Sequence, residues 1–373
     1  GIDSSTIVAL MQSISNQPIK TFTIGFEDAK FDEAPYAESV AKHLGTEHST
    51  LTVNEADAMN VVKSLAQLYD EPFADSSQIP TYLVCKAARE NITVALSGDG
   101  GDELFGGYNR YLWSSKIWNK FNNIPMPVKM LTGYLLRNSP LRTLDLISNT
   151  YNFLSPKRRK VTHLSSKLKR LGERLTTVRD TNDLYRSLVT EWSHGDNLFL
   201  KPIPETFTLL DDFLPTEVTQ DHEQWMMAQD MRSYLPDDIL CKVDRAAMGV
   251  SLETRVPFLD KDVIALSMRI PKNMKIRGTT GKWVLRQVLS KYIPNELIDR
   301  PKAGFAIPIG DWLRTSLRGW AEDLLSEKSL ASHGYFNHEV IRKIWAQHIS
   351  GKYDHTNKLW SLLMFQAWHR EWS

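Results

Sequence analysis

The feature that most constrains the fold of this chain is a short apolar run that leads into a loop rich in glycine and acid. Ile92 to Leu96 has the length and the β-branched content of a buried strand. The segment that follows, residues 97–108, has the sequence SGDGGDELFGGY. Its glycines let the backbone turn with positive φ and pass close to a ligand. Such a strand end is a candidate ligand site.

The loop combines two kinds of group that a nucleotide with its metal requires. Successive backbone N–H groups in a turn form a concavity that binds anions. Asp99, Asp102 and Glu103 supply oxygens of the kind that Mg²⁺ prefers. The sequence therefore predicts a site for a nucleotide triphosphate and Mg²⁺. The alternative is a glycine-rich turn whose acids are merely solvated.

The residues before this loop alternate between strand and helix patterns. This alternation predicts an α/β fold with a parallel, doubly wound sheet that binds ligands at the carboxyl ends of its strands. Asp3 or Ser4 is expected to cap a first helix, whose N-terminus is a ready anion site. Gly45 is expected to end the second helix and Asn54 to cap the third. The expected strands are 20–26, 47–53 and 92–96, and further expected helices cover 33–44 and 78–90.

The pattern changes after Tyr108, where strand-like runs disappear and amphipathic helical stretches continue to the end of the chain. We therefore expect a boundary near residue 110. An α/β part would occupy residues 1–110, and a mainly helical part would occupy residues 111–373.

Composition narrows the classes of partner. The formal net charge of +1 provides no overall field that would attract nucleic acid or an anionic membrane. Cys85 and Cys241 lack metal-ligand spacing, which argues against a disulfide scaffold or a zinc site and favours a reducing cytoplasm. No apolar run approaches the length of a bilayer span. We expect a cytoplasmic protein without a membrane partner.

Residues 156–179 are strongly basic and contain a single acid, Glu173. One interpretation is an RNA-binding strip, and the other is a solvated helical face. Aromatic residues that could stack on bases are not interleaved there. We favour the solvated face and do not expect nucleic acid as a partner.

Four ordered motifs resemble the synthetase domain of glutamine-dependent asparagine synthetases (the AsnB type). These enzymes are N-type ATP pyrophosphatases, named after their pyrophosphate loop. The resemblance covers nearly the whole chain, and the order and spacing of the motifs make it specific. The motifs are GIDSS at 1–5, SGDGGDELFGGY at 97–108, RAAMGVSLETRVPFLD at 245–260 and RPKAGF at 300–305.

The resemblance implies roles for individual residues. Asp3 matches the aspartate of the pyrophosphate loop that holds Mg²⁺, and Asp102 matches a second Mg²⁺ ligand. The positions that match groups contacting ATP are Ser4 and Ser5 for the pyrophosphate, Ser97 and Gly98 for the nucleotide, and Ile24 for the adenine. Local sequence alone would explain the first turn as helix capping and Ile24 as a buried strand residue.

Three further residues match groups around the reacting atoms. Asp99 stands where many asparagine synthetases carry Glu, which is proposed to order the adenylation site or to act as a base toward ammonia. Lys302 matches the lysine that neutralises charge on the α-phosphate, although a lysine in such a loop is often only solvated. Arg255 could bind a substrate carboxylate or pair with Glu253.

The implied activity is synthesis of an amide with ATP and Mg²⁺. A carboxylate, for which the best candidate is the β-carboxylate of aspartate, would be adenylated with release of pyrophosphate and then attacked by ammonia. The chain resembles the C-terminal piece of a longer protein, so ammonia is expected from a glutaminase domain that precedes it, and a homodimer is one expected assembly. Asp244 and Arg245 stand where the family carries Asn and Lys, which leaves the acceptor open.

Several alternatives therefore remain. The same chemistry could amidate another acceptor, such as a sugar acid of polysaccharide biosynthesis, or close a ring of the β-lactam type. A tRNA-modifying ATPase with the same loop would make use of the basic residues at 156–179. The last alternative is a remnant that has lost its activity.

Overall fold

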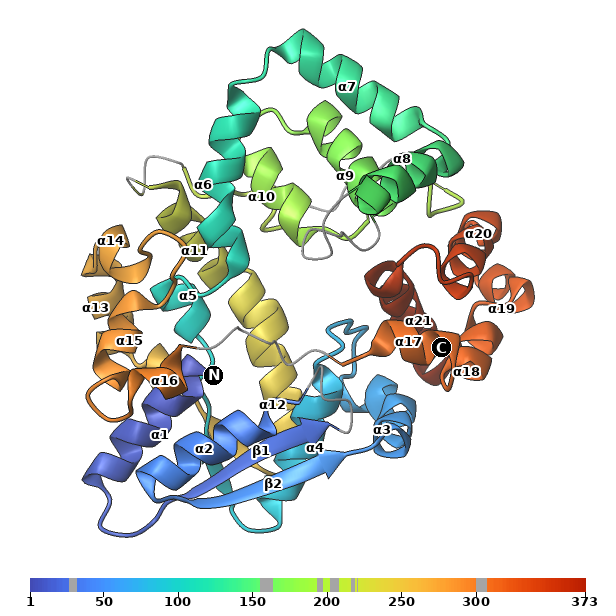
Figure 1. The fold of residues 1–373 in the computed structure, drawn as a ribbon. Helices are drawn as coiled ribbons and strands as arrows, with labels where there is room; N and C mark the ends of the chain where they lie inside the picture. The colour runs from blue at the N-terminus through green and yellow to red at the C-terminus, as the bar shows by residue number, and fades with distance from the viewer. Residues whose placement is uncertain are drawn as a thin grey trace. The chain divides into compact units, whose positions relative to one another are not determined.

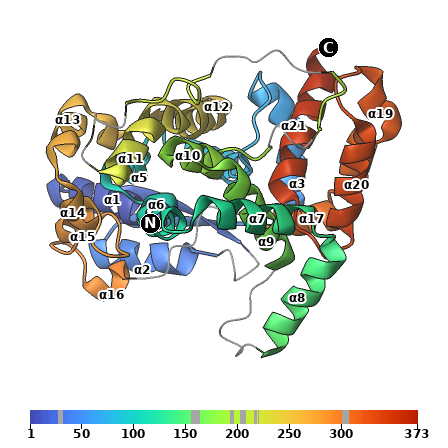
Figure 2. The same cartoon turned by 90° about the horizontal axis from the view of Figure 1, so that it is seen from above.

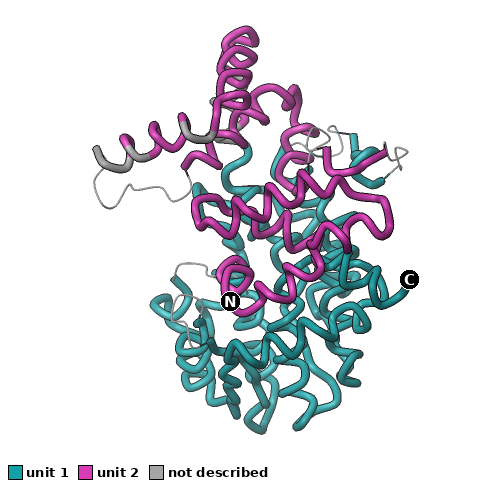
Figure 3. Tube along the Cα trace, turned by 90° about the vertical axis from the view of Figure 1, so that its right-hand side faces the viewer, with its two compact units in different colours: residues 1–114, 207–309, 364–373 teal, residues 115–206, 310–363 magenta. Residues whose placement is uncertain are grey.

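The computed structural model describes residues 1–26, 32–154, 164–192, 197–201, 208–215, 219, 221–299 and 307–373. These residues form two compact units, coloured separately in Figure 3. Unit 1 contains residues 1–114, 207–309 and 364–373, and unit 2 contains residues 115–206 and 310–363. Each unit draws on separate parts of the chain, and the domain boundary near residue 110 stays a prediction.

The first sheet of unit 1 consists of two parallel strands, β1 (Lys20–Phe26) and β2 (Glu47–Val53), joined through helix α2 (Ala34–Leu44) (Figure 1). Gly25 of β1 faces Ala34 of α2, whereas Phe22 packs with Cys85 of helix α4 (Gln78–Arg89). Residues of odd and even number point to opposite faces of a strand, so helices cover both faces of this sheet.

The second sheet of unit 1 pairs β3 (Val94–Leu96) with β4 (Glu253–Arg255), again in parallel. Leu96 lies opposite Arg255, and the Ser97 N–H donates to the Arg255 carbonyl oxygen at 2.9 Å. The chain therefore carries a mixed α/β fold that is mostly helical, with small parallel sheets. The described residues form two separate two-stranded sheets, so the expected doubly wound sheet is not resolved and stays a prediction. An apolar run predicts a strand but does not identify the strand's partner.

The helix boundaries expected from capping signals are largely confirmed. Gly45 ends α2 in the left-handed conformation with φ of 71°. Asn54 caps helix α3 (Glu55–Leu68) by accepting from the Asp57 N–H, and the Asp57 side chain completes a capping box. The expectation that Asp3 or Ser4 caps the first helix is wrong. Helix α1 (Ile2–Ile14) begins earlier, and Asp3 lies inside its first turn.

The remaining helices fill both units, and Figure 2 shows them from above. Unit 1 also contains α5 (Gly101–Phe105), α11 (His222–Arg232), the π-helix η4 (Leu235–Leu240), α12 (Cys241–Met248), the 3₁₀ turn η5 (Pro257–Leu259), α13 (Lys261–Arg269), α14 (Lys272–Lys275), α15 (Trp283–Leu289) and α16 (Asn295–Ile298). Unit 2 contains α7 (Met126–Asn138), α8 (Leu141–Leu154), α9 (Leu164–Thr177), α10 (Thr181–Val189), α18 (Arg318–Leu324), α19 (Glu327–Ser332) and α20 (His338–Ile349). Helices α6 (Asn109–Asn122), α17 (Ile309–Arg314) and α21 (Thr356–Trp372) carry residues of both.

An apolar cluster in unit 1 packs around α5, the helix formed by part of the glycine-rich loop. Ile7 of α1 packs with Leu104 and Phe105 of α5, with Phe258 of η5 and with Leu285 of α15. Burial of side chains of this size contributes about 1.5–3 kcal/mol each. The cluster therefore holds α1, α5 and α15 together next to the polar groups of the candidate site.

Among the described residues, no helix has the length and the apolar content needed to cross a membrane.

Candidate active site

The loop that follows β3 lies directly against the first turn of α1. A Cβ atom added to Gly98 would stand 2.7 Å from the Ser4 backbone nitrogen, which is too close for any side chain. The same Cβ would stand 2.9 Å from the Asp3 Cβ. Glycine at this position therefore allows two segments that are far apart in sequence to meet, as the two nucleotide-site motifs were expected to do.

Asp3 and Asp102 converge on one ammonium group, that of Lys282. The Lys282 Nζ lies 2.8 Å from Asp102 Oδ1 and also forms an ion pair with Asp3 Oδ2. The lysine side chain is only 6% exposed. Burial alone lowers the pKa of Lys282, but the two carboxylates outweigh burial and the pKa is raised. The ammonium group therefore stays charged in the folded protein.

The backbone around Lys282 is shaped to hold this contact. Lys282 has φ of 56°, a left-handed conformation that side chains rarely adopt, and it begins α15. Its N–H donates to the Phe105 carbonyl oxygen at 3.1 Å. A Cβ atom on Gly107 would overlap both Asp102 Oδ1 and Lys282 Cε. The loop and the start of α15 are thus fitted to each other.

The other two acids of the loop lie in less polar surroundings. Burial raises the pKa of Asp99, although the Ser97 hydroxyl and the Lys242 charge oppose this effect. Burial also raises the pKa of Glu103 to about 7. The Tyr108 hydroxyl donates to Glu103 Oε1 at 2.7 Å. Both side chains can therefore hold a proton more readily than a solvated acid can.

A buried ion pair fixes the exit of the loop. The Arg110 guanidinium donates to Asp230 Oδ2 from Nε at 2.8 Å, and its Nη2 lies 2.7 Å from the same oxygen. The Tyr111 hydroxyl also donates to Asp230, whose side chain is fully buried. The Arg110 guanidinium lies over the ring of Tyr108 at 4.1 Å. This arrangement ties the start of α6 to α11.

A second charged cluster in unit 1 contains Asp75, Asp238 and Lys242. The Lys242 Nζ donates to Asp75 Oδ2 at 2.7 Å. Burial and the neighbouring Asp75 raise the pKa of Asp238 to about 7, whereas the Lys242 charge opposes the rise. Asp238 belongs to the π-helix η4, a form of helix that is frequent at functional sites. Because Lys242 also acts on the pKa of Asp99, the cluster is electrostatically linked to the loop.

The other expected site residues are placed as follows. Ser4 is exposed and Ser5 is partly exposed on the first turn of α1, and Ile24 is buried within β1. The Arg255 Nε donates to Glu253 Oε1 at 2.7 Å, and both side chains are more than half exposed. Lys302 lies outside the described residues.

The two positions that depart from the family pattern line a hollow of about 470 Å³. Asp244 and Arg245 belong to α12, and Thr254 of β4 also lines the hollow. Arg245 is paired with Asp70 at 2.7 Å. Asp244 and Arg245 therefore lie near β4. The last residue of this strand, Arg255, accepts the hydrogen bond from the Ser97 N–H.

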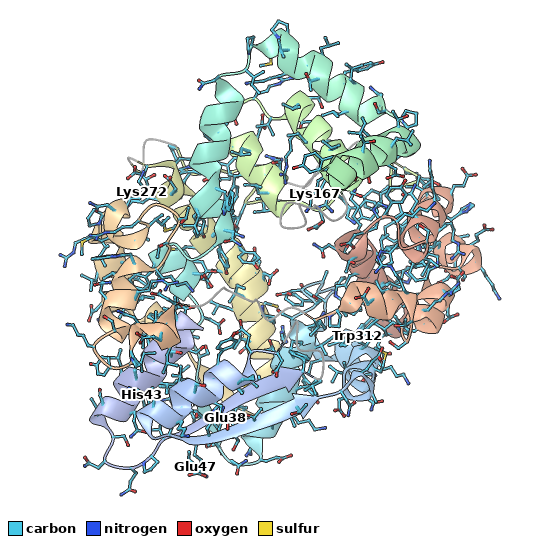
Figure 4. All side chains as sticks on the ribbon, in the orientation of Figure 1. Glu38, His43, Glu47, Lys167, Lys272 and Trp312 are labelled. Atoms are coloured by element: carbon cyan, nitrogen blue, oxygen red, sulfur yellow. The ribbon has the colours of Figure 1, made fainter. Side chains whose placement is uncertain are left out.

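Lys272 and Lys167, both labelled in Figure 4, illustrate the ordinary surface charges of the chain. Lys272 pairs with Asp221 at 2.7 Å. Lys167 is exposed on α9, within the basic segment 156–179. The described part of that segment thus includes solvated helical positions, whereas residues 156–163 lie outside the described residues.

Sequence reasoning missed Lys282, Arg110, Asp230 and Lys242. The dipeptide Gly281-Lys282, placed just before an apolar helical run, was the one local signal for Lys282. Arg110 and Asp230 carry no such signal, because their pairing joins segments that are far apart in sequence.

The carboxylates of the site fit Mg²⁺ of the kind that accompanies a nucleotide. Asp3 Oδ1 is buried and accepts no hydrogen bond from the described residues. Within the described part of the chain, no three His, Cys, Asp or Glu side chains gather as a metal site. Mg²⁺ is commonly bound by one or two carboxylates together with substrate phosphates and water. Asp3 and Asp102 match that donor set.

Comparison with known proteins identifies the family of this chain. Residues 1–370 match the family model described as asparagine synthase. Asparagine synthetase [glutamine-hydrolyzing] 1 of Bacillus subtilis (strain 168) is 30% identical over 374 residues, which cover 99% of this chain and 54% of that protein. A putative asparagine synthetase [glutamine-hydrolyzing] of Mycobacterium tuberculosis (strain ATCC 25618 / H37Rv) is 32% identical, over 99% of this chain and 53% of its own length.

A more distant relative carries a different name. Amidase chyE of Penicillium rubens is 21% identical over 90% of this chain and 52% of its own length. The chain spans about half the length of each of these relatives. The family match covers nearly the whole chain. The chain belongs to the asparagine synthase family.

Proposed function

We propose that this protein makes an amide from a carboxylate and ammonia with the energy of ATP, and that the carboxylate is the β-carboxylate of aspartate. The observation that carries this proposal is the meeting of Asp3, Asp102 and Lys282 between α1 and the glycine-rich loop. Synthetase domains of this family use ATP. A cluster of two carboxylates and one buried ammonium suits a triphosphate with its metal.

In the first step, a carboxylate oxygen of the substrate attacks the α-phosphorus of ATP and pyrophosphate leaves. Mg²⁺ held by Asp3 and Asp102 would neutralise phosphate charge. Ser4 and Ser5, which belong to the first turn of α1, are proposed to donate to the pyrophosphate. Lys302 is proposed to stabilise the charge that develops on the α-phosphate.

In the second step, ammonia attacks the acyl carbon of the adenylate, and AMP leaves with the electrons of the broken C–O bond. The nitrogen must lose a proton. Asp99 is proposed to accept it, because burial raises the pKa of this carboxyl and so makes it a better base. The names of two relatives include glutamine hydrolysis. We therefore propose that ammonia is supplied by another part of the full-length protein.

The test is to incubate the full-length protein with ATP, Mg²⁺, aspartate and ammonium, and to measure pyrophosphate and asparagine. We expect both products in equal amounts. Asp102→Asn should lower the rate by about 10²–10³-fold, as loss of one group that stabilises transition-state charge commonly does. Asp212→Asn, which removes an exposed partner of Arg232, is the matched control and should change little. Pyrophosphate release that does not depend on aspartate would contradict the assigned acceptor.

A second candidate keeps the chemistry and changes the acceptor to a sugar acid. It is favoured by Asp244 and Arg245, which line the hollow beside β4 in place of the usual Asn and Lys. The same assay with glucuronate instead of aspartate separates the two. Glucuronate-dependent pyrophosphate together with no response to aspartate would establish this alternative.

A further inference from the structure

We propose that Lys282 is a built-in counter-cation that competes with Mg²⁺ for Asp3 and Asp102, and so makes metal binding depend on the nucleotide. The inference rests on the proposed function in one respect, the assignment of Mg²⁺ to these two carboxylates. It adds a role for a residue that the motif comparison did not single out.

The competition follows from the contacts of the ammonium group. Lys282 Nζ forms ion pairs with Asp3 Oδ2 and with Asp102 Oδ1, the latter at 2.8 Å. A divalent cation bound to the same carboxylates would lie close to a positive charge that is itself 6% exposed and poorly screened. Metal alone is therefore disfavoured, although two carboxylates are in place to bind it.

The carboxylate oxygens are not used up by the lysine. Asp3 Oδ1 is buried and accepts no hydrogen bond from the described residues. A buried carboxylate oxygen without a partner is costly, and a cation or a donor from a ligand would satisfy it. The site thus contains a further position for positive charge, with Lys282 holding the carboxylates in place beside it.

The protein backbone maintains this position of Lys282 against a conformational cost. A non-glycine residue at φ of 56° is uncommon, and it persists where the surroundings over-determine it. The surroundings here are the hydrogen bond from the Lys282 N–H to the Phe105 oxygen and the close fit at Gly107. The position of the ammonium group is therefore a specific feature of the loop.

A nucleotide changes the charge balance of the site. Its phosphates bring several negative charges, which attract both the ammonium and the metal. Lys282 can then share its charge with phosphate oxygen, and the repulsion between Lys282 and the metal is offset. The metal and the nucleotide should therefore bind together and not one by one.

The experiment measures binding of Mn²⁺ to the full-length protein by electron paramagnetic resonance, with and without ATP, in the absence of aspartate. After correction for the Mn²⁺ that free ATP binds, the wild-type protein should bind Mn²⁺ at least about tenfold more tightly with ATP than without it. Lys282→Met should bind Mn²⁺ without ATP at least about tenfold more tightly than the wild type. Its melting temperature should rise on addition of Mn²⁺, because the metal neutralises two carboxylates that have lost their partner.

Lys275→Met is the matched control, because Lys275 is also a buried lysine of unit 1 but belongs to α14. Its Mn²⁺ binding should equal that of the wild type. Equal Mn²⁺ affinity of Lys282→Met and the wild type without ATP, while both bind Mn²⁺–ATP, would overturn the inference and leave the proposed function standing. If Lys282→Met fails to fold, the inference is tested on the wild-type protein alone. Mn²⁺ binding by the wild type that is as tight without ATP as with it overturns the inference. Failure of the wild type to bind Mn²⁺–ATP would instead overturn the proposed function.

Discussion

The two units bury ionisable groups in opposite ways. In unit 1, the carboxylate cluster of Asp3 and Asp102 is charged and is neutralised by Lys282. In unit 2, burial lowers the pKa values of the histidine cluster formed by His348 and His355, whose ring nitrogens contact backbone groups, Gln347 and the Arg314 guanidinium. The fully buried His348 bonds through Nε2 to the Gly310 oxygen at 3.0 Å, and its Nδ1 accepts from the His355 N–H at 3.2 Å.

This difference between the two clusters indicates that one can bind ligands and that the other supports the structure. Buried charges cost free energy unless they are paired, and a paired cluster can exchange its partner for a charged ligand. A neutral histidine loses the hydrogen bond that its unprotonated ring nitrogen accepts, here the bond from the His355 N–H to His348 Nδ1, when that nitrogen takes up a proton. The carboxylate cluster is therefore suited to bind ions, and the histidine cluster is suited to hold α17 and α20 together.

The largest expected effect is acid destabilisation of the histidine cluster. Burial lowers the pKa of His355 from 6.5 to about 4 and also lowers that of His348. The unfolded chain then binds protons below pH 6.5 that the folded unit does not, so stability falls between pH 6.5 and pH 4. For His355 the loss is at most about 3 kcal/mol. Hydrogen exchange of residues 338–355 at pH 7 and pH 4.5 measures it.

The variant for this test is His355→Gln, which keeps a polar side chain near Gln347, its partner at 2.9 Å. Its loss of protection on acidification should be smaller than that of the wild type. An unchanged pH response in the variant would assign the acid sensitivity to other groups. Peptides covering 55–68 of unit 1 provide the internal reference.

The next effect tests how closely the carboxylate cluster is fitted. Gly107→Ala should destabilise unit 1 by about 2 kcal/mol, because the added methyl overlaps Asp102 and Lys282. Gly319→Ala in α18 of unit 2 is the opposite case, since no atom lies within 4 Å of the added methyl. It should stabilise by about 0.5–1 kcal/mol, because alanine favours a helix over glycine. Thermal unfolding compares the two, and equal effects of the two substitutions would contradict a tight fit at Gly107.

Another effect should have the opposite dependence on pH from the histidine cluster. The pKa of Asp238 in unit 1 rises from 3.8 to about 7, so the folded protein holds a proton that the unfolded chain has lost. Stability from this group therefore falls as pH rises from about 4 to 7. Asp75, whose pKa is lowered with the help of Lys242, opposes part of the change.

Asp238→Asn removes this titration and keeps a neutral side chain. Its melting temperature should rise relative to the wild type between pH 5 and pH 7 and then level off. A constant difference across this range would show that Asp238 titrates normally. Asp212→Asn, at an exposed position, is the reference for loss of an acid without a buried neighbour.

Local signals in the sequence predicted much of the fold. Gly45 and Asn54 marked helix ends because capping depends on a few neighbouring residues. The strand before the glycine-rich loop was also visible, although β3 is shorter than expected and its residues Val94 and Leu96 are exposed, not buried. The pairing of β3 with β4 was not, because it depends on a contact between residues more than a hundred positions apart.

The same division applies to the candidate site. The sequence by itself determined the glycine-rich loop, its acids and the family resemblance, because these lie in contiguous motifs. Only the tertiary structure brought Asp3 of α1 and Asp102 of the loop onto the Lys282 ammonium at the start of α15. That meeting requires an apolar cluster beneath α1, α5 and α15 and glycine at the closest approaches. Charge pairing between distant segments is a property of packing, so no local pattern could have specified it.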